Sequence, residues 1–331
     1  MPVTVLRFNL VDPHADRQSL ARRYGAALEM AAYADQRGIT AVQTEEHHGV
    51  AGGWLPSPLT FAGAVLGATR TVTVTVCALI TALYDPLRLA EDIAVLDLTG
   101  GGRLVTVAGI GQRPQEYASH GKDWSRRGAL QDEALETLLA AWSGRPFAYH
   151  GRTVRITPRP YSRPHPPLLV GGSSRAAARR AARLGLPFLP SAHLPALETY
   201  YHARRAEYGT EGWCLMPAPR TVLLHVADDP DRVWAEYGRH LLHEARSCAP
   251  GRPAGARSAA ADTAALRREG VFRVLTPEQC VAFVNAEGQR TGLVLHPLCG
   301  GMPVAEGQRS LRLFAERVLP RLATRTGAAT A

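Results

Sequence analysis

The amino-acid sequence predicts an α/β fold, in the form of a (β/α)8 TIM barrel that carries insertions. Strand-like and helix-like stretches alternate about eight times along the 331 residues, which is typical of proteins with a parallel sheet. A chain of this length also suits eight such units with extra segments. The alternative, a doubly wound sheet, requires a glycine-rich turn after the first strand. The corresponding turn here, Val11-Asp12-Pro13-His14, has no glycine.

Helix boundaries are clear in the first half of the chain. Gly38 follows a stretch with apolar residues at helical spacing and is expected to end that helix. Ser57 suits a helix N-cap, and Asp85 followed by Pro86 suits the N-cap and first helical position. The β-branched runs between these helices favour strands. In chain order the expected elements are a strand at 3–10, a helix at 19–37, a strand at 39–44, a helix from 57 to about 69, a strand at 72–78, a helix at 85–100 and a strand at 103–108.

The second half of the chain is less regular. His150-Gly151 predicts the turn of a β-hairpin that interrupts the alternation. The segment at about 247–275 begins rich in Ala, Gly and Arg, and we interpret it as a mobile insertion in a single domain that spans residues 1–331. In chain order the expected elements are a helix at 126–142, a hairpin at 147–156, a strand at 168–170, a helix at 171–184, a strand at 186–189, a helix at 195–208, a strand at 221–226, helices at 231–246 and 277–287, a strand at 292–296 and a helix at 306–322.

Composition excludes several classes of protein. No apolar run is long enough to span a membrane, and residues 1–12 lack the pattern of a signal peptide. The five cysteines are far apart and form no C-x-x-C pair, which argues against a zinc ribbon or a disulfide framework and fits a reducing cytoplasm. The net charge of +9 is spread along the chain without an aromatic-interleaved stripe, so we expect no nucleic-acid partner.

Four polar residues, Glu45, Glu46, His47 and His48, stand where the predicted strand 39–44 ends and a loop begins. Catalytic groups of a TIM barrel come from the C-terminal ends of its strands. Side chains alternate in an extended segment, so Glu45 and His47 should share one face and Glu46 and His48 the other. One pair can then face a pocket while the scaffold holds the other. A solvated strand end with mutual ion pairs is the alternative, and a metal site is disfavoured because neighbouring residues point to opposite faces.

Two further kinds of site are predicted locally. Gly171-Gly172-Ser173-Ser174 lies between a strand and a helix, where bare backbone N–H groups and hydroxyls suit an anion, although a simple serine cap is an alternative. Polar residues also follow two other strand ends and either line a substrate or belong to solvated loops. They are Gln112, Arg113, Ser191 and His193.

Several stretches together resemble the bacterial luciferase-like, flavin-dependent monooxygenase family. The resemblance covers essentially the whole chain, and the order and spacing of the pieces carry it. The pieces are Glu46-His47-His48, Pro56-Ser57-Pro58-Leu59, the run 85–92, Leu96-Asp97, Gly101-Gly102-Arg103, Gly109-Ile110-Gly111, the run 166–174 and His296-Pro297-Leu298.

The resemblance implies a TIM barrel that binds a reduced flavin at its C-terminal mouth. His47 takes the position of the family's active-site histidine, which can accept a proton near neutral pH. Cys77-Ala78 matches a non-prolyl cis peptide beneath the flavin ring. Gly109 replaces a reactive cysteine of true luciferases and is expected to leave room for substrate. The remaining implied cofactor residues hold the phosphate and are Gly171, Gly172, Ser173 and Ser174. Glu46 and His48 are expected on the substrate side or as residues that orient the loop.

The function implied by the resemblance is an FMN-dependent monooxygenase. Reduced FMN and O2 would form a C4a-hydroperoxide that oxidises a small organic or natural-product substrate. A separate, transiently bound reductase would supply FMNH2, because the sequence contains no second dinucleotide-binding unit. An F420-dependent oxidoreductase that transfers hydride is the first alternative, and a non-catalytic flavin-binding protein is the second. Members of the family commonly form homodimers, and the apolar stretch 59–66 is compatible with such an interface.

Overall fold

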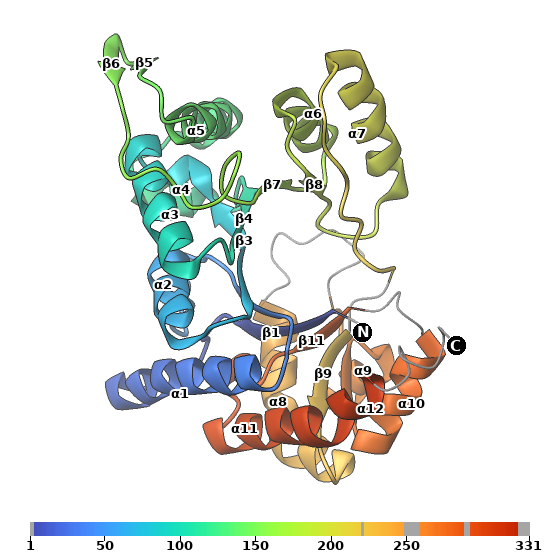
Figure 1. Ribbon diagram of the computed structural model, residues 1–331. Coiled ribbons are helices and arrows are strands. Elements are labelled where there is room, and N and C mark those ends of the chain that lie inside the picture. The colour runs from blue at the N-terminus through green and yellow to red at the C-terminus, as the bar shows by residue number, and fades with distance from the viewer. Residues whose placement is uncertain (1–2, 220–221, 248–257, 288–291, 324–331) are drawn as a thin grey trace. The chain divides into compact units, whose positions relative to one another are not determined.

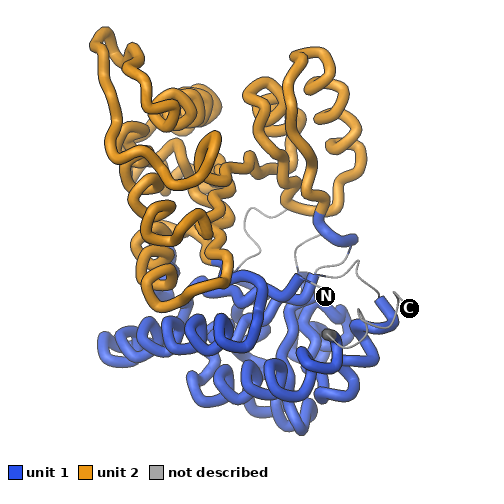
Figure 2. The backbone as a smooth tube through the Cα atoms, in the orientation of Figure 1, with its two compact units in different colours: residues 1–43, 50–55, 217–331 blue, residues 44–49, 56–216 orange. Residues whose placement is uncertain are grey.

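The computed structural model of the chain describes residues 3–219, 222–247, 258–287 and 292–323 (Figure 1). The chain divides into two compact units (Figure 2). Unit 1 comprises residues 1–43, 50–55 and 217–331, and unit 2 comprises residues 44–49 and 56–216. The single domain over residues 1–331 stays a prediction. Among the described helices, none combines the length and the apolar character needed to cross a membrane.

Unit 1 is built on a parallel sheet with helices around it. Its elements are β1 (Thr4–Phe8), α1 (Arg17–Gln36), β2 (Ala41–Thr44), β9 (Val222–Val226), α8 (Pro230–Ser247), α9 (Thr263–Glu269), β10 (Phe272–Leu275), α10 (Pro277–Glu287), β11 (Leu293–Leu295), η5 (Cys299–Gly301), α11 (Val304–Leu313), the π-helical turn η6 (Phe314–Val318) and α12 (Leu319–Ala323). The strands lie in the order β10, β9, β11, β1, β2. The pairs β10–β9, β9–β11 and β11–β1 are parallel, with Leu6 opposite Leu295.

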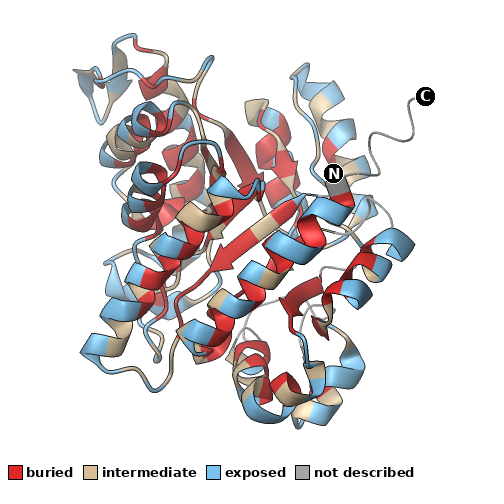
Figure 3. Cartoon of the chain, turned by 60° about the horizontal axis from the view of Figure 1, so that its bottom comes forward, coloured by how far each residue is buried: buried red, intermediate tan, exposed pale blue. Residues whose placement is uncertain are grey.

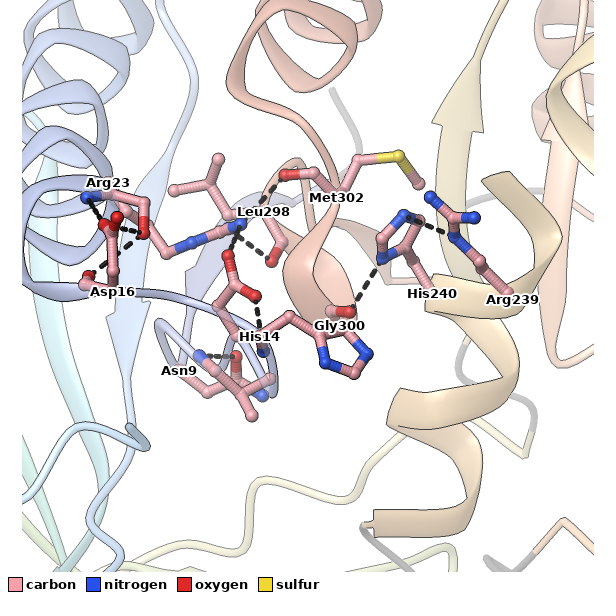
Figure 4. Close-up of polar contacts among 12 residues, drawn as sticks. Asn9, His14, Asp16, Arg23, Arg239, His240, Leu298, Gly300 and Met302 are labelled. Atoms are coloured by element: carbon pink, nitrogen blue, oxygen red, sulfur yellow. Dashed lines mark hydrogen bonds and ion pairs between the residues drawn. The ribbon is translucent and has the colours of Figure 1, made fainter. Parts of the chain in front are cut away.

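A buried arginine fastens helix α1 to the loop that follows β11 (Figure 4). Arg23 is 3% exposed and donates to the carbonyl oxygens of Leu298 and Met302, each at 3.1 Å. The same guanidinium group donates to Oδ2 of Asp12 at 2.8 Å. A buried charge is tolerated only when it is paired and hydrogen-bonded, and these three acceptors meet that condition.

Unit 2 has its own parallel sheet, in the order β3, β4, β7, β8, and a separate antiparallel hairpin of β5 and β6. Its elements are α2 (Pro58–Ala68), β3 (Thr73–Ile80), η1 (Thr81–Leu83), α3 (Pro86–Gly100), β4 (Leu104–Gly109), α4 (Pro114–Ser119), η2 (Trp124–Arg126), α5 (Arg127–Trp142), β5 (Phe147–Tyr149), β6 (Arg152–Val154), β7 (Leu168–Gly171), α6 (Arg175–Leu184), β8 (Phe188–Leu189) and α7 (Pro195–Tyr208). Sheet strands are largely buried, whereas most helices expose one face to solvent (Figure 3).

Close helix packing covers the sheet of unit 2. A Cβ atom at Gly63 of α2 would lie 2.9 Å from a methyl of Leu96, and one at Gly100 of α3 would lie 2.8 Å from a methyl of Leu66. Both glycines therefore let α2 and α3 approach each other. The indole N–H of Trp142 in α5 donates to the carbonyl oxygen of Ala90 in α3 at 3.0 Å, which satisfies a buried polar group.

Helix ends agree with the sequence signals. The Asp85 carboxylate accepts the N–H groups of Leu87 and Arg88, both at 3.0 Å, and Pro86 is the first helical residue. The hairpin forms and turns at His150 and Gly151, both of which have positive φ. Ser57 also occupies an N-cap position, but its side chain makes no capping hydrogen bond.

Among the described elements, the sequence does not predict α4, α9, β10 or the short turns η1, η2 and η5. The expected mobile insertion at about 247–275 falls partly on residues 248–257, which lie outside the described residues. Within the described part of that segment, α9 forms a helix capped by Asp262, and β10 pairs in parallel with β9. Residues 263–275 are therefore mostly regular structure rather than irregular loop.

Candidate active site

The expected site residues all fall in unit 2. At the end of β2 the four polar residues separate into two pairs, as alternation predicts. Nε2 of His47 lies 3.5 Å from Oε2 of Glu45, and the His47 side chain is 24% exposed. Nε2 of His48 lies 2.8 Å from Oε1 of Glu46, whose side chain is fully buried. The first pair is therefore the one that reaches solvent or a ligand.

Glu46 is the centre of a buried hydrogen-bond network. Its Oε2 accepts the backbone N–H of Ile80, at the end of β3, at 2.6 Å. Its Oε1 accepts the phenol of Tyr84 at 2.7 Å and Nε2 of His48 at 2.8 Å. Burial, and then the nearby Glu46 carboxylate, raise the pKa of the Tyr84 phenol well above its ordinary value, so the phenol stays a donor. Both Glu46 oxygens are buried and already bonded, which favours the alternative that Glu46 orients the loop; a place on the substrate side stays a prediction.

The segment after β4 holds the backbone of His48. A carboxylate oxygen of Glu116 accepts the His48 N–H at 3.2 Å, and Arg113 donates to the His48 carbonyl oxygen at 3.0 Å. The Arg113 guanidinium lies 3.7 Å from the same Glu116 oxygen. The Tyr117 phenol, whose pKa burial raises to about 12, donates to the Ile110 carbonyl oxygen at 2.7 Å. Arg113 thus contacts the protein chain, whereas Gln112 is exposed.

Small residues line the ends of β3 and β4. The peptide bond between Cys77 and Ala78 is cis, as the family resemblance implies. Gly109 is buried opposite Ile80, and a Cβ atom at Gly109 would lie only 2.7 Å from the Cβ of Ala78. A side chain at position 109 would therefore collide with Ala78, and the expectation that Gly109 leaves room for substrate stays a prediction. Together, Ala78 and Gly109 leave this part of the sheet without bulky side chains.

The N-terminus of α6 has the bare backbone that an anion site requires. A Cβ atom at Gly171 would lie 2.9 Å from Val107, and one at Gly172, where φ is +145°, would lie 2.9 Å from Ala177. Glycine is therefore needed at both positions. Ser174 is the N-cap and accepts the Ala177 N–H at 3.2 Å, so the alternative of a simple cap applies to this serine.

Ser173 and Ser191 come together although they are predicted for different roles. Their hydroxyl groups are hydrogen-bonded to each other, and both residues are exposed. The Arg175 guanidinium lies over the Tyr200 ring, 5.3 Å from its centroid, and His193 is exposed on the same chain segment as Ser191. The hydroxyl pair therefore stands beside the start of α6, where α6 presents its first N–H groups.

Sequence reasoning missed Tyr84 and Glu116, which complete the network around Glu46 and His48. Tyr84 directly precedes the recognised Asp85-Pro86 helix start, and Glu116 is in the first turn of α4, whose Pro114 is a helix-start signal. These local signals mark helix starts, but they do not indicate which strand end the side chains reach.

One group in the described residues of unit 1 has the composition of a metal site. Glu244, His296 and Cys299 each offer a ligand atom within 4.8 Å of the others, and all three are buried. However, Nδ2 of Asn9 donates to both Glu244 oxygens, at 2.9 and 3.0 Å, and Arg7 lies 3.4 Å from one of them. Donors and a cation thus already hold the Glu244 carboxylate, which leaves it less available to a metal ion.

A family model described as luciferase-like monooxygenase matches residues 1–293. The chain belongs to this family. The uncharacterized protein y4wF of Sinorhizobium fredii is 33% identical over 54% of this chain and 54% of its own length. The FMNH2-dependent dimethylsulfone monooxygenase of Pseudomonas putida is 31% identical over 38% of this chain and 37% of its own length. The chain thus spans about half the length, or less, of these curated relatives.

Several solved structures match nearly the whole chain in fold. The monooxygenase RslO1 from Streptomyces bottropensis has a TM-score of 0.75 at 24% identity and covers 96% of this chain and 99% of its own. The oxygenating constituent of 3,6-diketocamphane monooxygenase from Pseudomonas putida, solved with FMN, has a TM-score of 0.71 at 20% identity over 97% and 98% of the two chains. An F420-dependent secondary alcohol dehydrogenase, solved with an F420-acetone adduct, has a TM-score of 0.65 at 16% identity over 97% and 99%. The predictions of the family and of its TIM-barrel fold are confirmed.

Proposed function

We propose that this luciferase-like family member is an enzyme that uses reduced FMN and O2 to oxygenate a small organic substrate. Membership of the family supports a flavin-dependent reaction, and a relative named as an FMNH2-dependent monooxygenase supports the choice of cofactor and oxidant. Reduced FMN, when bound, supplies the electrons for the reaction with O2. The chain's own residues bind it, exclude water and move the proton.

The observation that carries the cofactor proposal is the pair of glycines before α6. Because Cβ atoms at Gly171 and Gly172 would collide with Val107 and Ala177, the backbone there must stay bare. A phosphate at this point would meet the first N–H groups of α6 and the Ser173 hydroxyl. The small surface formed by Ala78 and Gly109 suits a flat ring. These residues therefore fit a cofactor with a planar ring and a phosphate.

His47 is the residue we assign to catalysis. It stands at the C-terminal end of a barrel strand, and its ring is partly exposed while its neighbours Glu46 and His48 are held by the protein. An imidazole in this setting accepts a proton from substrate or returns one. The Glu45 carboxylate lies 3.5 Å from Nε2 and can hold the ring in one orientation.

An F420-dependent hydride transfer is the second candidate. One structural neighbour is an F420-dependent dehydrogenase, and Arg175 and Arg179 are exposed at the start of α6. Exposed arginines near the phosphate segment suit the longer anionic tail of F420. The proposed FMN reaction is favoured because one named relative is FMNH2-dependent and one structural neighbour was solved with FMN.

We also propose that a separate reductase supplies FMNH2 and that the enzyme works as a homodimer in the cytoplasm.

The stretch 59–66, considered from sequence as an interface, is mostly buried within unit 2. The neighbouring helix α3 exposes Val95 and Leu98, at 48% and 43%. Helix α3 is therefore the better candidate surface for a second copy. Sedimentation velocity of the Leu98→Asp variant, which should be monomeric, tests this assignment.

Anaerobic titration distinguishes the two cofactors. The proposal expects FMNH2 to bind with micromolar or lower Kd and F420 to bind at least tenfold more weakly. His47→Gln should leave FMNH2 binding within about twofold while it changes the reaction with O2. His150→Gln is the matched control, because His150 is an exposed histidine on the hairpin that pairs with Glu133. Tight F420 binding without FMNH2 binding would move the protein to hydride chemistry.

A further inference from the structure

The end of β2 is held on both sides of His47. We infer that Glu46, His48, Arg113 and Glu116, which we call the strand-end clamp, position the His47 ring for the proton transfer. The inference rests on the proposed function of His47. Its structural basis is separate, because it consists of printed contacts among the other residues. The members of the clamp are positioning residues rather than catalytic residues.

The first half of the clamp fixes Glu46. Its carboxylate has no exposed surface and accepts three hydrogen bonds, of 2.6 to 2.8 Å, from Ile80, Tyr84 and His48. Hydrogen bonds to an ionised acceptor are short and strong, and a buried carboxylate that lost them would be unstable. Glu46 therefore cannot move without displacing the end of β3.

The second half of the clamp fixes the peptide groups of His48. Arg113 bonds to its carbonyl oxygen and Glu116 to its N–H, so both backbone polar groups are held by the segment after β4. Arg113 and Glu116 are themselves 3.7 Å apart, which makes the two contacts mutually supporting. The His120 ring packs edge-on against the His48 ring, with the ring centroids 4.4 Å apart.

His47 lies between these two anchored residues. With Glu46 and His48 both fixed, the Cα position and the backbone of His47 are set, and the side chain points to the opposite face from its neighbours. Within unit 2, the clamp joins the residues that follow β2 to the ends of β3 and β4, and these two strands also carry Ala78 and Gly109. It therefore links the position of the catalytic histidine to the surface that we assign to the flavin ring. Proximity of this kind is a large part of catalytic efficiency.

The test begins with three substitutions in the 331-residue chain, and a pair of His48 variants is added below. Glu46→Gln replaces one of the two acceptor oxygens with an amide NH2 group. This group cannot accept the hydrogen bond that the replaced oxygen accepts. Tyr84→Phe removes the phenol that donates to Glu46 and keeps the aromatic ring. It is the substitute variant if Glu46→Gln does not fold. Glu133→Gln is the control, because Glu133 of α5 and His150 of the hairpin form a Glu–His pair with the same 2.8 Å distance in a more exposed place.

The first readout is the delay before oxidised FMN appears when the anaerobic protein–FMNH2 complex meets aerated buffer. We expect Glu46→Gln to shorten this delay at least tenfold, Tyr84→Phe to shorten it about threefold, and both to keep the FMN Kd within twofold. Glu133→Gln should behave as wild type. His48→Gln, which retains a side-chain N–H donor, should restore most of the delay that His48→Leu loses. The inference would be overturned if Glu46→Gln and Tyr84→Phe left the delay unchanged. It would also be overturned if these variants weakened FMN binding by the same factor as they shortened the delay.

The second readout needs no cofactor. Hydrogen exchange at the His48 amide should become at least tenfold faster in Glu46→Gln and stay unchanged in Glu133→Gln. This measurement separates the two proposals, because it detects the clamp even if the wild-type protein shows no delay and the FMN reaction is wrong. Unchanged exchange at the His48 amide in Glu46→Gln would refute the clamp, whatever the outcome with FMNH2.

Discussion

Replacing Gly109 with alanine tests whether small residues are required where β3 and β4 end. The new Cβ atom would lie 2.7 Å from the Cβ of Ala78, whereas carbon atoms in contact prefer about 3.5–4.0 Å. Because a Cβ atom is fixed to its backbone, the strands must move apart by about 0.8 Å or more. Overpacking of this kind costs about 1–3 kcal/mol. A value of about 2 kcal/mol corresponds to roughly thirtyfold in the unfolding equilibrium constant.

The assay is urea unfolding followed by far-UV circular dichroism, together with titration of FMN. Gly109→Ala should lower the unfolding midpoint and weaken FMN binding, because the shift displaces Ala78. Gly25→Ala is the matched control. Gly25 is exposed in the middle of α1 with no atom within 4 Å of its Cβ position, so alanine there should stabilise the protein by up to about 1 kcal/mol. Equal midpoints for Gly109→Ala and wild type would refute the packing argument.

Three further predictions concern acid stability, a buried ion pair and the phosphate segment. Hydrogen bonding from His225 lowers the pKa of the Glu306 carboxyl from its ordinary 4.5 to about 2. The ionised carboxylate therefore contributes its full stabilisation above pH 4.5, and this contribution is lost as the pH falls toward 2. Glu306→Gln should flatten the loss of stability between these pH values, as measured by urea unfolding. Arg23→Met should cost about 3 kcal/mol in the same assay, since it leaves buried acceptors without a donor, and a loss below 1 kcal/mol would contradict this. Gly172→Ala should weaken FMN but not riboflavin, which lacks the phosphate, in fluorescence titrations; equal weakening of both would argue against a phosphate at this point.

Local signals predicted the fold elements well where a cap or a glycine marks the boundary. Helix α7 has the expected bounds, because Pro195 suits the first helical position and Gly209 takes the left-handed conformation after the last turn. Helix α9 was not expected, since only Leu266 in it is buried and its sequence lacks an apolar stripe. The parallel pairing of β10 with β9 is a long-range contact that no local pattern encodes.

The candidate site was predictable in its residue types but not in its partners. Alternation separates Glu45 and His47 from Glu46 and His48, yet it does not say which pair is buried. That depends on the Tyr84 phenol and the Ile80 N–H, which the fold brings to Glu46 from the end of β3 and the turn that follows it. Gly109 shows the same limit. The sequence shows that the position lacks a side chain, and only the structure reveals that Ala78 lies where one would point.

The most direct test of the proposed function is a stopped-flow experiment that mixes the anaerobic protein–FMNH2 complex with aerated buffer and follows the absorbance of oxidised FMN. The account predicts a delay relative to free FMNH2, because a site closed to water controls the reaction with O2, and a shorter delay in His47→Ala. Oxidation as fast as that of free FMNH2, combined with tight binding of F420, would contradict the monooxygenase proposal and favour hydride transfer.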